Sequence, residues 1–451
     1  MLQRKIINEL EKWSKEPKKR ALCIIGARQI GKTTAVRTFA QEHYTCFVEI
    51  NFIEDKNAEK IFAGALDANT IITNLTAYSN KTLIPGETLI LLDEVQECPN
   101  VRTAIKFLVE DGRFDYVETG SLLGVKYKDV KSYPVGYEEI HRMYPLDFEE
   151  FLWANGVQQD TINYVQNCCE KLQSLTELIH NTMLRLFQTY IVVGGMPAVV
   201  QDYVDNHDIG RVINLQQNIL AAYRLDIAKY TIGGDRLKVK NIFDSLGAQL
   251  DSKNRRFMLS KIAEKGRLSV YENSFAWLTE AGVALPCYNV AAPVAPLTLN
   301  VKHSLFKLYM GDTGLLCASS LDNVQFAVLN GDLAINMGSI LENVMAQQLQ
   351  SQGIKLYYFA NKKYGEIDFI MQQGSKIVPL EIKSGNDYTK HKALDHIMAV
   401  EAWEIKKALV FCKSNIEQRE GITYLPWYGV MFLKGNFFPE QLHYEVDISK
   451  L

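Results

Sequence analysis

Short apolar runs alternate with helical patterns in the first third of the chain. The run at 21–25 leads into a glycine-containing loop and then into a helical pattern that continues to about residue 43. A second run, at 88–93, ends in acidic residues, and a strand-like segment follows at 115–121. Apolar runs of this length are typical of strands buried on both faces of a parallel sheet. The pattern therefore predicts an α/β domain at the N-terminus.

The middle of the chain has a helical pattern instead. From about 150 to 230 there are few glycines or prolines apart from the segment VVGGMPAVV, which we interpret as a turn between helices. An amphipathic stretch at 269–282 is followed by two strand-like runs, LPCYNV and LFKLYM. A helical lid followed by a winged helix, with 269–282 in the recognition position, accounts for this order. Winged helices also serve as struts between domains, so DNA contact and a structural role both stay open.

A hairpin pattern centred on Gly374–Ser375 appears in the last quarter of the chain. A two-residue loop with glycine first suits a type II′ turn. Antiparallel pairing across that turn predicts Asp368 opposite Glu381 and Glu366 opposite Lys383, with all four side chains on one face. Two carboxylates that face each other destabilise a sheet unless a cation neutralises them.

Composition limits the class of protein. The 451 residues are 47% hydrophobic and 22% charged with a net charge of −3, which is ordinary for a globular chain of two to four domains. The eight cysteines form no CxxC pair, so we interpret them as buried thiols in a reducing compartment. The charged N-terminal segment is no signal peptide, and no run of 18 apolar residues occurs. We therefore expect a cytoplasmic protein with no membrane partner.

The loop after the first apolar run fits a phosphate-binding pattern. Gly26, four further residues, Gly31, Lys32 and Thr33 match GxxxxGK followed by Ser or Thr, and Thr34 comes next. Glycines let backbone N–H groups surround the phosphates, the lysine reaches their oxygens, and the hydroxyl holds Mg²⁺. The sequence thus predicts ATP and Mg²⁺ as cofactors.

Polar residues end the next two predicted strands. Asp93 would hold Mg²⁺ and Glu94 would orient the attacking water, because acids at the carboxyl end of a strand lie beside the phosphate-binding loop. Thr119 and Ser121 offer hydroxyl groups that could sense the γ-phosphate. The alternatives are a core strand capped by solvated acids and, for Thr-Gly-Ser, a plain turn.

Five short segments of the chain together match the motifs of a known family. GARQIGKTT, LLDEVQECP, ETGS, YPLDFEEFL and GGMP, in this order and spacing, resemble an uncharacterised prokaryotic family of AAA-type ATPases. Members of that family carry a winged-helix region and a C-terminal restriction-endonuclease-like domain. The resemblance, which covers nearly the whole chain, implies Lys32 and Thr33 as Walker A residues, Asp93 and Glu94 as the Walker B pair, and Ser121 as the sensor-like residue.

The resemblance also implies a fold and a domain division. We expect an α/β chain in four parts: a P-loop AAA-type ATPase core with a RecA/AAA-like parallel sheet (1–150), a helical lid (151–230), a winged-helix-like domain (231–330) and a nuclease-like α/β domain (331–451). Relatives often carry arginine where this chain has Tyr137. If that arginine completes the ATPase site in the family, this chain uses another arginine, for example Arg142, or hydrolyses ATP slowly, because an arginine finger raises the rate by about 10³–10⁵.

The C-terminal hairpin and the helix pattern before it resemble the PD-(D/E)xK nuclease core. By this resemblance the matching residues are Glu342, Asp368, Glu381 and Lys383, with Ile367 where the motif name has proline. Asp368 and Glu381 would hold a divalent metal, and Lys383 would orient its water or stabilise charge on the phosphate. The alternative is a solvated face, with Glu366 and Lys383 as a surface ion pair worth under about 1 kcal/mol.

The partners remain open at this stage. Segment 236–267 has nine basic and three acidic residues, whereas 331–451 is balanced at 13 against 14, so affinity for DNA would come from the basic segment or an oligomer. The first hypothesis is an ATP-regulated enzyme acting on DNA, and the rival is a nucleotide-switched regulator that binds DNA or a protein partner without cutting. A homo-oligomer is compatible with either.

Overall fold

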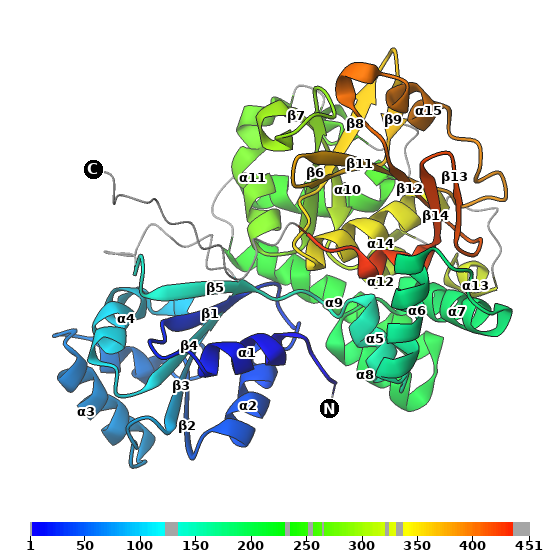
Figure 1. Cartoon of the computed structure of the whole chain (residues 1–451). Helices are drawn as coiled ribbons and strands as arrows, with labels where there is room; N and C mark the ends of the chain where they lie inside the picture. The colour runs from blue at the N-terminus through cyan, green and yellow to red at the C-terminus, as the bar shows by residue number, and fades with distance from the viewer. Residues whose placement is uncertain are drawn as a thin grey trace, which may run out of the picture.

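A computed structural model describes residues 2–121, 134–230, 235–250, 256–263, 266–320, 324–330 and 337–435. Figure 1 shows two masses: the N-terminal part, in blue and cyan, and a larger body that contains the green helices and the yellow-to-red C-terminal sheets. Among the described helices, none combines the length and the apolar character that crossing a lipid bilayer would need.

The N-terminal part is a five-stranded parallel sheet with strand order β2-β3-β4-β1-β5. Alternate residues of these strands enter two separate cores, one with α1 and α2 and the other with α3 and α4, so helices cover both faces. This confirms the predicted α/β class and P-loop fold. The strands and helices are β1 (Ala21–Ile25), β2 (Cys46–Asn51), β3 (Thr88–Asp93), β4 (Asp115–Gly120), β5 (Glu138–Arg142), α1 (Ile6–Ser14), α2 (Lys32–His43), α3 (Ala68–Ser79) and α4 (Pro99–Asp111).

A helical region follows the sheet. Helices α5 to α9 occupy the segment expected to be a lid, and α10 and α11 precede the second sheet (Figure 1). Their bounds are α5 (Phe148–Ala154), α6 (Gln159–Lys171), α7 (Glu177–Val193), α8 (Pro197–Asn206), α9 (Ile209–Tyr230), α10 (Asp235–Leu250) and α11 (Leu268–Glu280).

Two further sheets form the rest of the body, with strand orders β7-β6-β8-β9 and β10-β11-β12-β14-β13. The two strands expected to be a wing are β6 and β7, and β6 pairs in parallel with β8. One sheet therefore crosses the boundary predicted at residue 330. The strands are β6 (Ala284–Val290), β7 (Val301–Met310), β8 (Tyr357–Asn361), β9 (Gly365–Ile367), β10 (Phe369–Gln373), β11 (Lys376–Ile382), β12 (Ala408–Cys412), β13 (Glu417–Arg419) and β14 (Ile422–Pro426).

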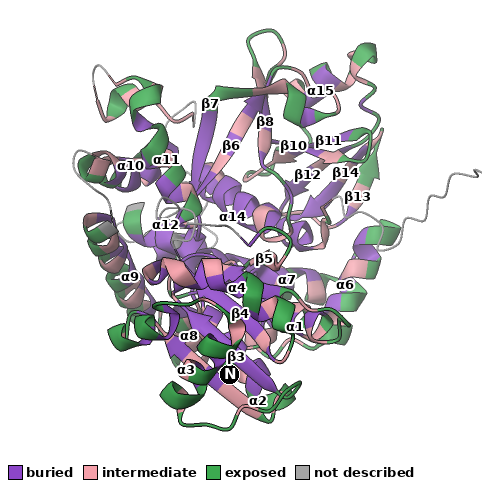
Figure 2. Ribbon diagram, turned by 90° about the vertical axis from the view of Figure 1, so that its left-hand side faces the viewer, coloured by how far each residue is buried: buried purple, intermediate pink, exposed green. Residues whose placement is uncertain are grey.

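Helix α14 (Met337–Ser351) is buried along most of its length between these sheets and the helical region (Figure 2). The other helices of this part are α12 (Thr313–Ser320), α13 (Val324–Leu329) and α15 (Lys392–Met398), and the short 3₁₀ turns include η1 (Lys56–Phe62), η2 (Val95–Glu97) and η7 (Trp427–Phe432). One hydrophobic core joins α1 and α2 to α5, α7, α14 and η7. The N-terminal sheet and the C-terminal sheets are thus packed through a shared apolar interior.

The glycine pair of GGMP is a tight crossing point between segments. Gly195 accepts a hydrogen bond from the Leu146 N–H at 2.7 Å, and its own N–H donates to buried Asp312 at 2.6 Å. A Cβ atom on Gly195 would lie 2.1 Å from the Leu146 carbonyl oxygen. Backbone from three distant segments therefore meets here at a distance that only glycine allows.

We expect Gly195→Ala to lower the free energy of unfolding by about 1–3 kcal/mol, because the added methyl group forces the Leu146 backbone away. Urea unfolding of both proteins measures the difference. Gly385→Ala is the matched control, since nothing lies within 4 Å of its added methyl group, and should change stability by less than about 0.5 kcal/mol. Equal effects of the two changes would contradict the crossing described above.

A buried cluster of polar side chains lies between helix α4 and strands β1, β4 and β5. The sulfur of Cys23 and carboxylate oxygens of Glu118 and Glu138 lie within 4.8 Å of one another. Arg102 of α4 donates to Glu118 at 2.7 Å and to both oxygens of Glu138. Because the Arg102 guanidinium group already binds both carboxyl groups, we interpret the cluster as a buried hydrogen-bonded network and not as a metal site.

Burial raises the pKa of Glu118 well above its usual value, against the opposing effect of Arg102. An acid with a raised folded pKa contributes stability below its unfolded pKa and loses that contribution as the pH rises through the folded pKa. We therefore expect the parent protein to lose more stability than Glu118→Gln between pH 5 and pH 8 in urea unfolding. Glu59→Gln, at an exposed acid, should behave as the parent does; equal losses in Glu118→Gln and the parent would contradict this assignment.

Candidate functional site

The phosphate-binding loop has the backbone that its glycines predict. It runs from the end of β1 to the start of α2, with Gly26 at φ +153° and Gly31 at φ +88°. A Cβ atom on Gly26 would lie 2.2 Å from the Met143 carbonyl oxygen. The loop is therefore built around glycine at both positions, and α2 begins with its free N–H groups beside the loop.

Lys32 is folded into this loop. It is 7% exposed, and its ammonium group donates to the carbonyl oxygens of Gly26 at 3.1 Å and Ala27 at 2.8 Å. Burial lowers the pKa of Lys32 to about 8, only partly offset by Glu94 and Asp93. A buried cation whose charge is incompletely compensated is what a phosphate-binding site requires.

Asp93 lies directly beside the loop. It is 3% exposed and accepts hydrogen bonds from Thr33 at 3.1 and 3.2 Å, from Asn51 at 2.9 Å and from Thr119. Burial raises the pKa of Asp93 despite these donors. A hydroxyl group beside a buried carboxylate is a donor set that fits Mg²⁺.

Glu94 and Ser121 are neighbours at the same edge of the sheet. Glu94 has φ +57°, and its carboxylate accepts hydrogen bonds from Gln96 and, at 3.4 Å, from the Ser121 hydroxyl. Strand β4 lies between β1 and β3, which places its carboxyl end between the loop and Asp93. The structure thus brings together the residues that the sequence predicted as Walker A, Walker B and sensor positions; their roles in catalysis remain predictions.

A cleft of about 440 Å³ opens over the loop. Its lining includes Lys32, Thr33, Thr34 and Glu94 and, unforeseen from the sequence, Asn51, Arg28 and Lys229. Arg28 of the loop forms an ion pair with Asp226 of α9, so this helix is tied to the loop. Arg28 lies inside the glycine motif and could have been singled out, whereas nothing in the sequence connects Lys229, some 200 residues further on, to the cleft.

The two residues discussed for an arginine finger lie elsewhere. The Tyr137 hydroxyl donates to Glu110 at 2.5 Å, at the opposite end of the sheet from the loop. Arg142 lines a different cavity, on the far side of Gly26 and Ala27, and is not among the described residues around the 440 Å³ cleft. The prediction that Arg142 completes the nucleotide site is therefore not matched by its position in this chain.

The C-terminal hairpin forms with the predicted register. Gln373 pairs with Lys376 and Phe369 with Leu380, and the ladder ends there, one residue before Asp368 and Glu381, which were predicted to face each other. The prediction is wrong for Glu366. The chain bends at Asp368 and enters another sheet, where Glu366 pairs with Ala360 of β8 and its carboxylate binds Lys307 at 2.7 Å instead of Lys383.

Lys307, which the sequence did not single out, is central to this region. It is fully buried and binds Glu342 at 3.2 Å as well as Glu366. Glu342 is 0% exposed and also accepts a hydrogen bond from the Tyr309 hydroxyl at 2.9 Å. The helix acid of the nuclease-like motif is thus held by a lysine from β7. A single lysine within the apolar run LFKLYM was the available signal.

Glu381 and Lys383 lie beside Asp368. The Lys383 ammonium donates to Glu381 Oε1 at 2.9 Å, and Asp368 accepts from the Ile382 N–H at 2.8 Å. Glu381 Oε2 is buried and has no hydrogen-bond partner among the residues that the structure describes. Burial and then the nearby Asp368 raise the pKa of Glu381 to about 7. The donor set fits a hard divalent cation through carboxylate oxygens.

The described carboxylate oxygens around the hairpin do not form a group of three potential ligands within 4.8 Å of one another. Within the described ranges, the one group of three potential ligands with all atoms within 4.8 Å is Cys23, Glu118 and Glu138 of the parallel sheet. A metal here would be bound by Asp368 and Glu381 with water completing its shell.

The basic segment is only partly described. Lys253, Arg255 and Lys265 lie outside the described residues. Lys238 and Lys240 are paired with acids, Asp235 at 3.0 Å and Asp244 at 2.7 Å. Two of the nine basic residues of the segment are thus paired with acids of α10.

Comparison with known proteins supports the N-terminal assignment. Residues 18–152 match a family model described as an AAA domain, whereas 184–325 and 337–429 match two domains of unknown function, DUF8612 and DUF4143. Together with the parallel sheet and the glycine loop, the first match identifies this part of the chain as an AAA-type P-loop ATPase domain. A search of curated proteins finds no match.

Among solved structures, the similarities are weak. Aeropyrum pernix Orc1 in complex with DNA is 12% identical with a TM-score of 0.29, over 71% of this chain and 92% of that one. Thermotoga maritima RuvB, a Holliday junction branch migration motor, is 13% identical with a TM-score of 0.28, over 63% and 89%. Pyrobaculum aerophilum Cdc6p is 12% identical with a TM-score of 0.24, over 72% and 92%. Scores this low carry no argument about function.

Proposed function

We propose that this chain binds Mg²⁺–ATP on the loop at 26–33 and hydrolyses it. The observation that carries the proposal is Lys32, a buried ammonium group held by loop carbonyls, with the Thr33–Asp93 contact beside it. Lys32 and the N–H groups at the start of α2 would bind the phosphate oxygens, and Thr33 and Asp93 would hold Mg²⁺. The metal would neutralise charge that develops on the phosphates.

Glu94 would orient the attacking water, with Gln96 and Ser121 fixing its carboxylate. Besides Lys32, the described lining of the cleft includes two cations, Arg28 and Lys229, that could act as an arginine finger does. Phosphate release from ATP by the purified full chain, with Mg²⁺ and with EDTA, tests the proposal. Release that requires Mg²⁺ supports it, and nucleotide binding without any release would reduce the protein to a nucleotide-binding switch.

A second candidate function is metal-dependent cleavage of DNA at the C-terminal hairpin. It is favoured by the buried Glu381 Oε2, a carboxylate oxygen without a hydrogen-bond partner in the described part of the chain, next to Asp368 and Lys383. Asp368 and Glu381 would hold Mg²⁺ or Mn²⁺, which would activate water, and Lys383 would stabilise charge on the phosphate. Glu342 would be the fourth residue of the motif, and its carboxylate forms an ion pair with Lys307.

Linear, supercoiled and branched DNA, incubated with Mg²⁺ or Mn²⁺ and with or without ATP, tests this function. We expect Glu381→Gln to reduce cleavage at least about 100-fold, because the metal loses a charged ligand. Glu401→Gln, at an exposed acid outside the site, is the matched control and should cut as the parent does. Absence of cleavage by the parent under every condition would rule the activity out.

The rival is a nucleotide-switched regulator with an inactive nuclease fold. Lys307 favours it, since an internal ammonium group already balances Glu342 and Glu366. Arg4 offers a route for the switch: it donates to the Ile30 carbonyl of the loop at 2.7 Å and to Glu150 of α5 at 3.1 Å. Helix α5 in turn donates, through the Phe148 N–H, to Gln348 of α14 at 3.1 Å. Binding of DNA or of a protein partner that depends on ATP, by a chain that does not cleave DNA, would favour the regulator over the nuclease.

A further inference from the structure

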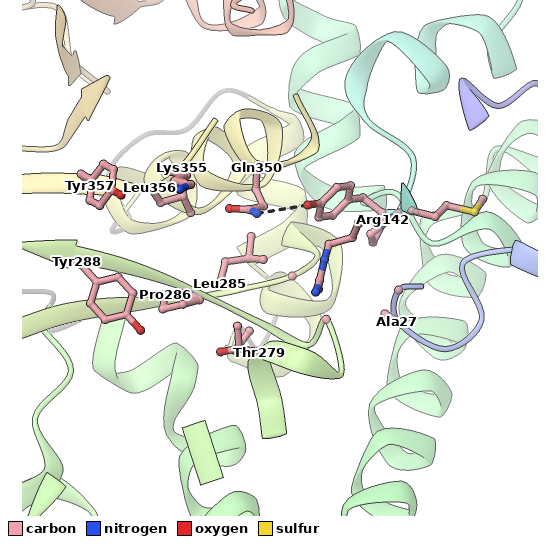
Figure 3. A pocket seen from close by; sticks show the side chains of 17 residues that line it. Ala27, Arg142, Thr279, Leu285, Pro286, Tyr288, Gln350, Lys355, Leu356 and Tyr357 are labelled. Atoms are coloured by element: carbon pink, nitrogen blue, oxygen red, sulfur yellow. Dashed lines mark hydrogen bonds between the residues drawn. The ribbon is translucent and has the colours of Figure 1, made fainter. Parts of the chain in front are cut away.

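A second cavity, of about 300 Å³, lies where three parts of the chain meet (Figure 3). The loop contributes Gly26 and Ala27, the segment after β5 contributes Arg142 and its neighbours, and β6, α14 and β8 close the other sides. None of its described lining residues belongs to the cleft over Lys32 and Thr33. The cavity is therefore separate from the site proposed for ATP.

The charge of this cavity is positive. Arg142 and Lys355 line it from opposite parts of the chain, and no aspartate or glutamate of the described segments does. Both side chains are exposed, and neither has an ion pair or a side-chain hydrogen bond with any residue that the structure describes. Figure 3 shows the Arg142 side chain extending into the space between Leu285 and Ala27. Two uncompensated cations around one cavity favour an anionic ligand.

The far end of the cavity is aromatic. Tyr288 of β6 and Tyr357 of β8 are direct partners in the sheet, and Pro286 lies beside them (Figure 3). Nucleobases stack favourably on such rings, whatever their sequence. Hydrogen-bonding groups are also present, since Thr279 and Gln350 line the wall and Gln350 donates to the Tyr144 hydroxyl at 3.3 Å.

We propose that this cavity binds one phosphorylated nucleoside, with its phosphate near Arg142 and Lys355 and its base against Tyr288 and Tyr357. The volume is at the small end of the range of ligand pockets, which suits a single nucleotide unit. The unit could be a free mononucleotide or one nucleotide of a single strand, because both present the same phosphate and base.

The cavity also adjoins the ATP loop from behind. Gly26 and Ala27, which line it, are the residues whose carbonyl oxygens hold Lys32. Gly282, at the turn between α11 and β6, approaches the Ala27 backbone so closely that a Cβ atom would lie 3.0 Å from its nitrogen. A ligand that packs against this backbone is therefore expected to alter ATP affinity, and binding to the cavity itself does not depend on the proposed hydrolysis.

The test uses the full chain with Lys32→Met, which removes the main phosphate contact of the ATP cleft. Calorimetric titration with AMP and with a 12-nucleotide oligo(dT) measures binding at the remaining site. We expect Arg142→Ala/Lys355→Ala to weaken binding of the probe at least 10-fold. Arg185→Ala/Lys407→Ala removes the same charges from positions outside the cavity and should change binding less than 2-fold.

Each outcome decides the proposal. Binding of AMP that depends on Arg142 and Lys355 supports a free nucleotide as the ligand, and tighter binding of oligo(dT) with the same dependence supports a strand. Tyr288→Leu/Tyr357→Leu should weaken AMP binding but leave binding of inorganic phosphate unchanged. If neither probe binds the Lys32→Met chain, or if both pairs of alanine substitutions have equal effects, the proposal is overturned.

Discussion

Replacing Lys32 with methionine is expected to lower the affinity of the chain for ATP at least about 100-fold. Each charge-assisted hydrogen bond from an ammonium group to a phosphate contributes roughly 1.5–3 kcal/mol. The carbonyl oxygens of Gly26 and Ala27 hold the Lys32 ammonium group inside the loop. Methionine preserves the length and apolar stem of the side chain, so the loop can keep its packing. Titration with ATP and Mg²⁺ measures the change.

The same substitution has a second, independent signature. Because burial lowers the pKa of Lys32 to about 8, the folded chain without nucleotide is destabilised by the charged form below that pH. Stability of the parent should therefore rise with pH between about 8 and 10.5, and Lys32→Met should be at least as stable as the parent at pH 7. Lys12→Met, at an exposed lysine, should change neither ATP affinity nor this pH dependence. A Lys32→Met chain that binds ATP normally would contradict the site.

Replacing Glu94 with glutamine is expected to lower the rate of ATP hydrolysis about 10²–10⁴-fold while ATP binding persists. The Glu94 carboxylate lines the cleft beside the loop and is the group proposed to orient water. An amide of the same shape keeps the contacts to Gln96 and Ser121 without accepting a proton. Steady-state phosphate release and equilibrium ATP binding, measured on the same preparations, separate the two effects.

Glu87→Gln is the matched control for Glu94→Gln, since Glu87 is an exposed acid just before β3. Its rate should equal that of the parent. Unchanged hydrolysis in Glu94→Gln would remove Glu94 from the mechanism.

The local features of the ATP site could be predicted from the sequence because each depends on neighbouring residues. The glycine loop at 26–33 lies between its strand and helix as the apolar pattern predicts, and Asp93 ends a buried strand. The adjacency of Asp93 to Thr33 follows once the strands are parallel. Lys229 was not predictable, since it reaches the cleft only through the packing of α9 against the loop.

The register of the C-terminal hairpin could be predicted from the sequence, but the sheet that Glu366 joins could not. The turn at Gly374 fixed the pairing of Phe369 with Leu380, because register follows from loop length. It could not reveal that the chain leaves this sheet at Asp368 and that Glu366 joins β8, since the partner strand is set by tertiary packing. The same holds for Lys307, whose two acidic partners come from α14 and β9.

The domain boundary expected at residue 330 falls within one sheet, because β6 and β7 lie before it and β8 and β9 after it. The runs LPCYNV and LFKLYM were correctly predicted as paired strands, and a winged helix ends in such a pair. Only the parallel partnership of β6 with β8, across about 70 residues of chain, shows that they belong to the C-terminal sheet. The hydrophobic periodicity of a segment predicts a strand but does not predict which other strand pairs with it.

The most direct test of the central claim is a calorimetric titration of the full chain with ATP, once with Mg²⁺ and once with EDTA. The account predicts one ATP site per chain that binds more tightly with Mg²⁺, because Thr33 and Asp93 hold the ion against the phosphates. Failure to bind ATP at millimolar concentration, or affinity that is the same with Mg²⁺ and with EDTA, would contradict it.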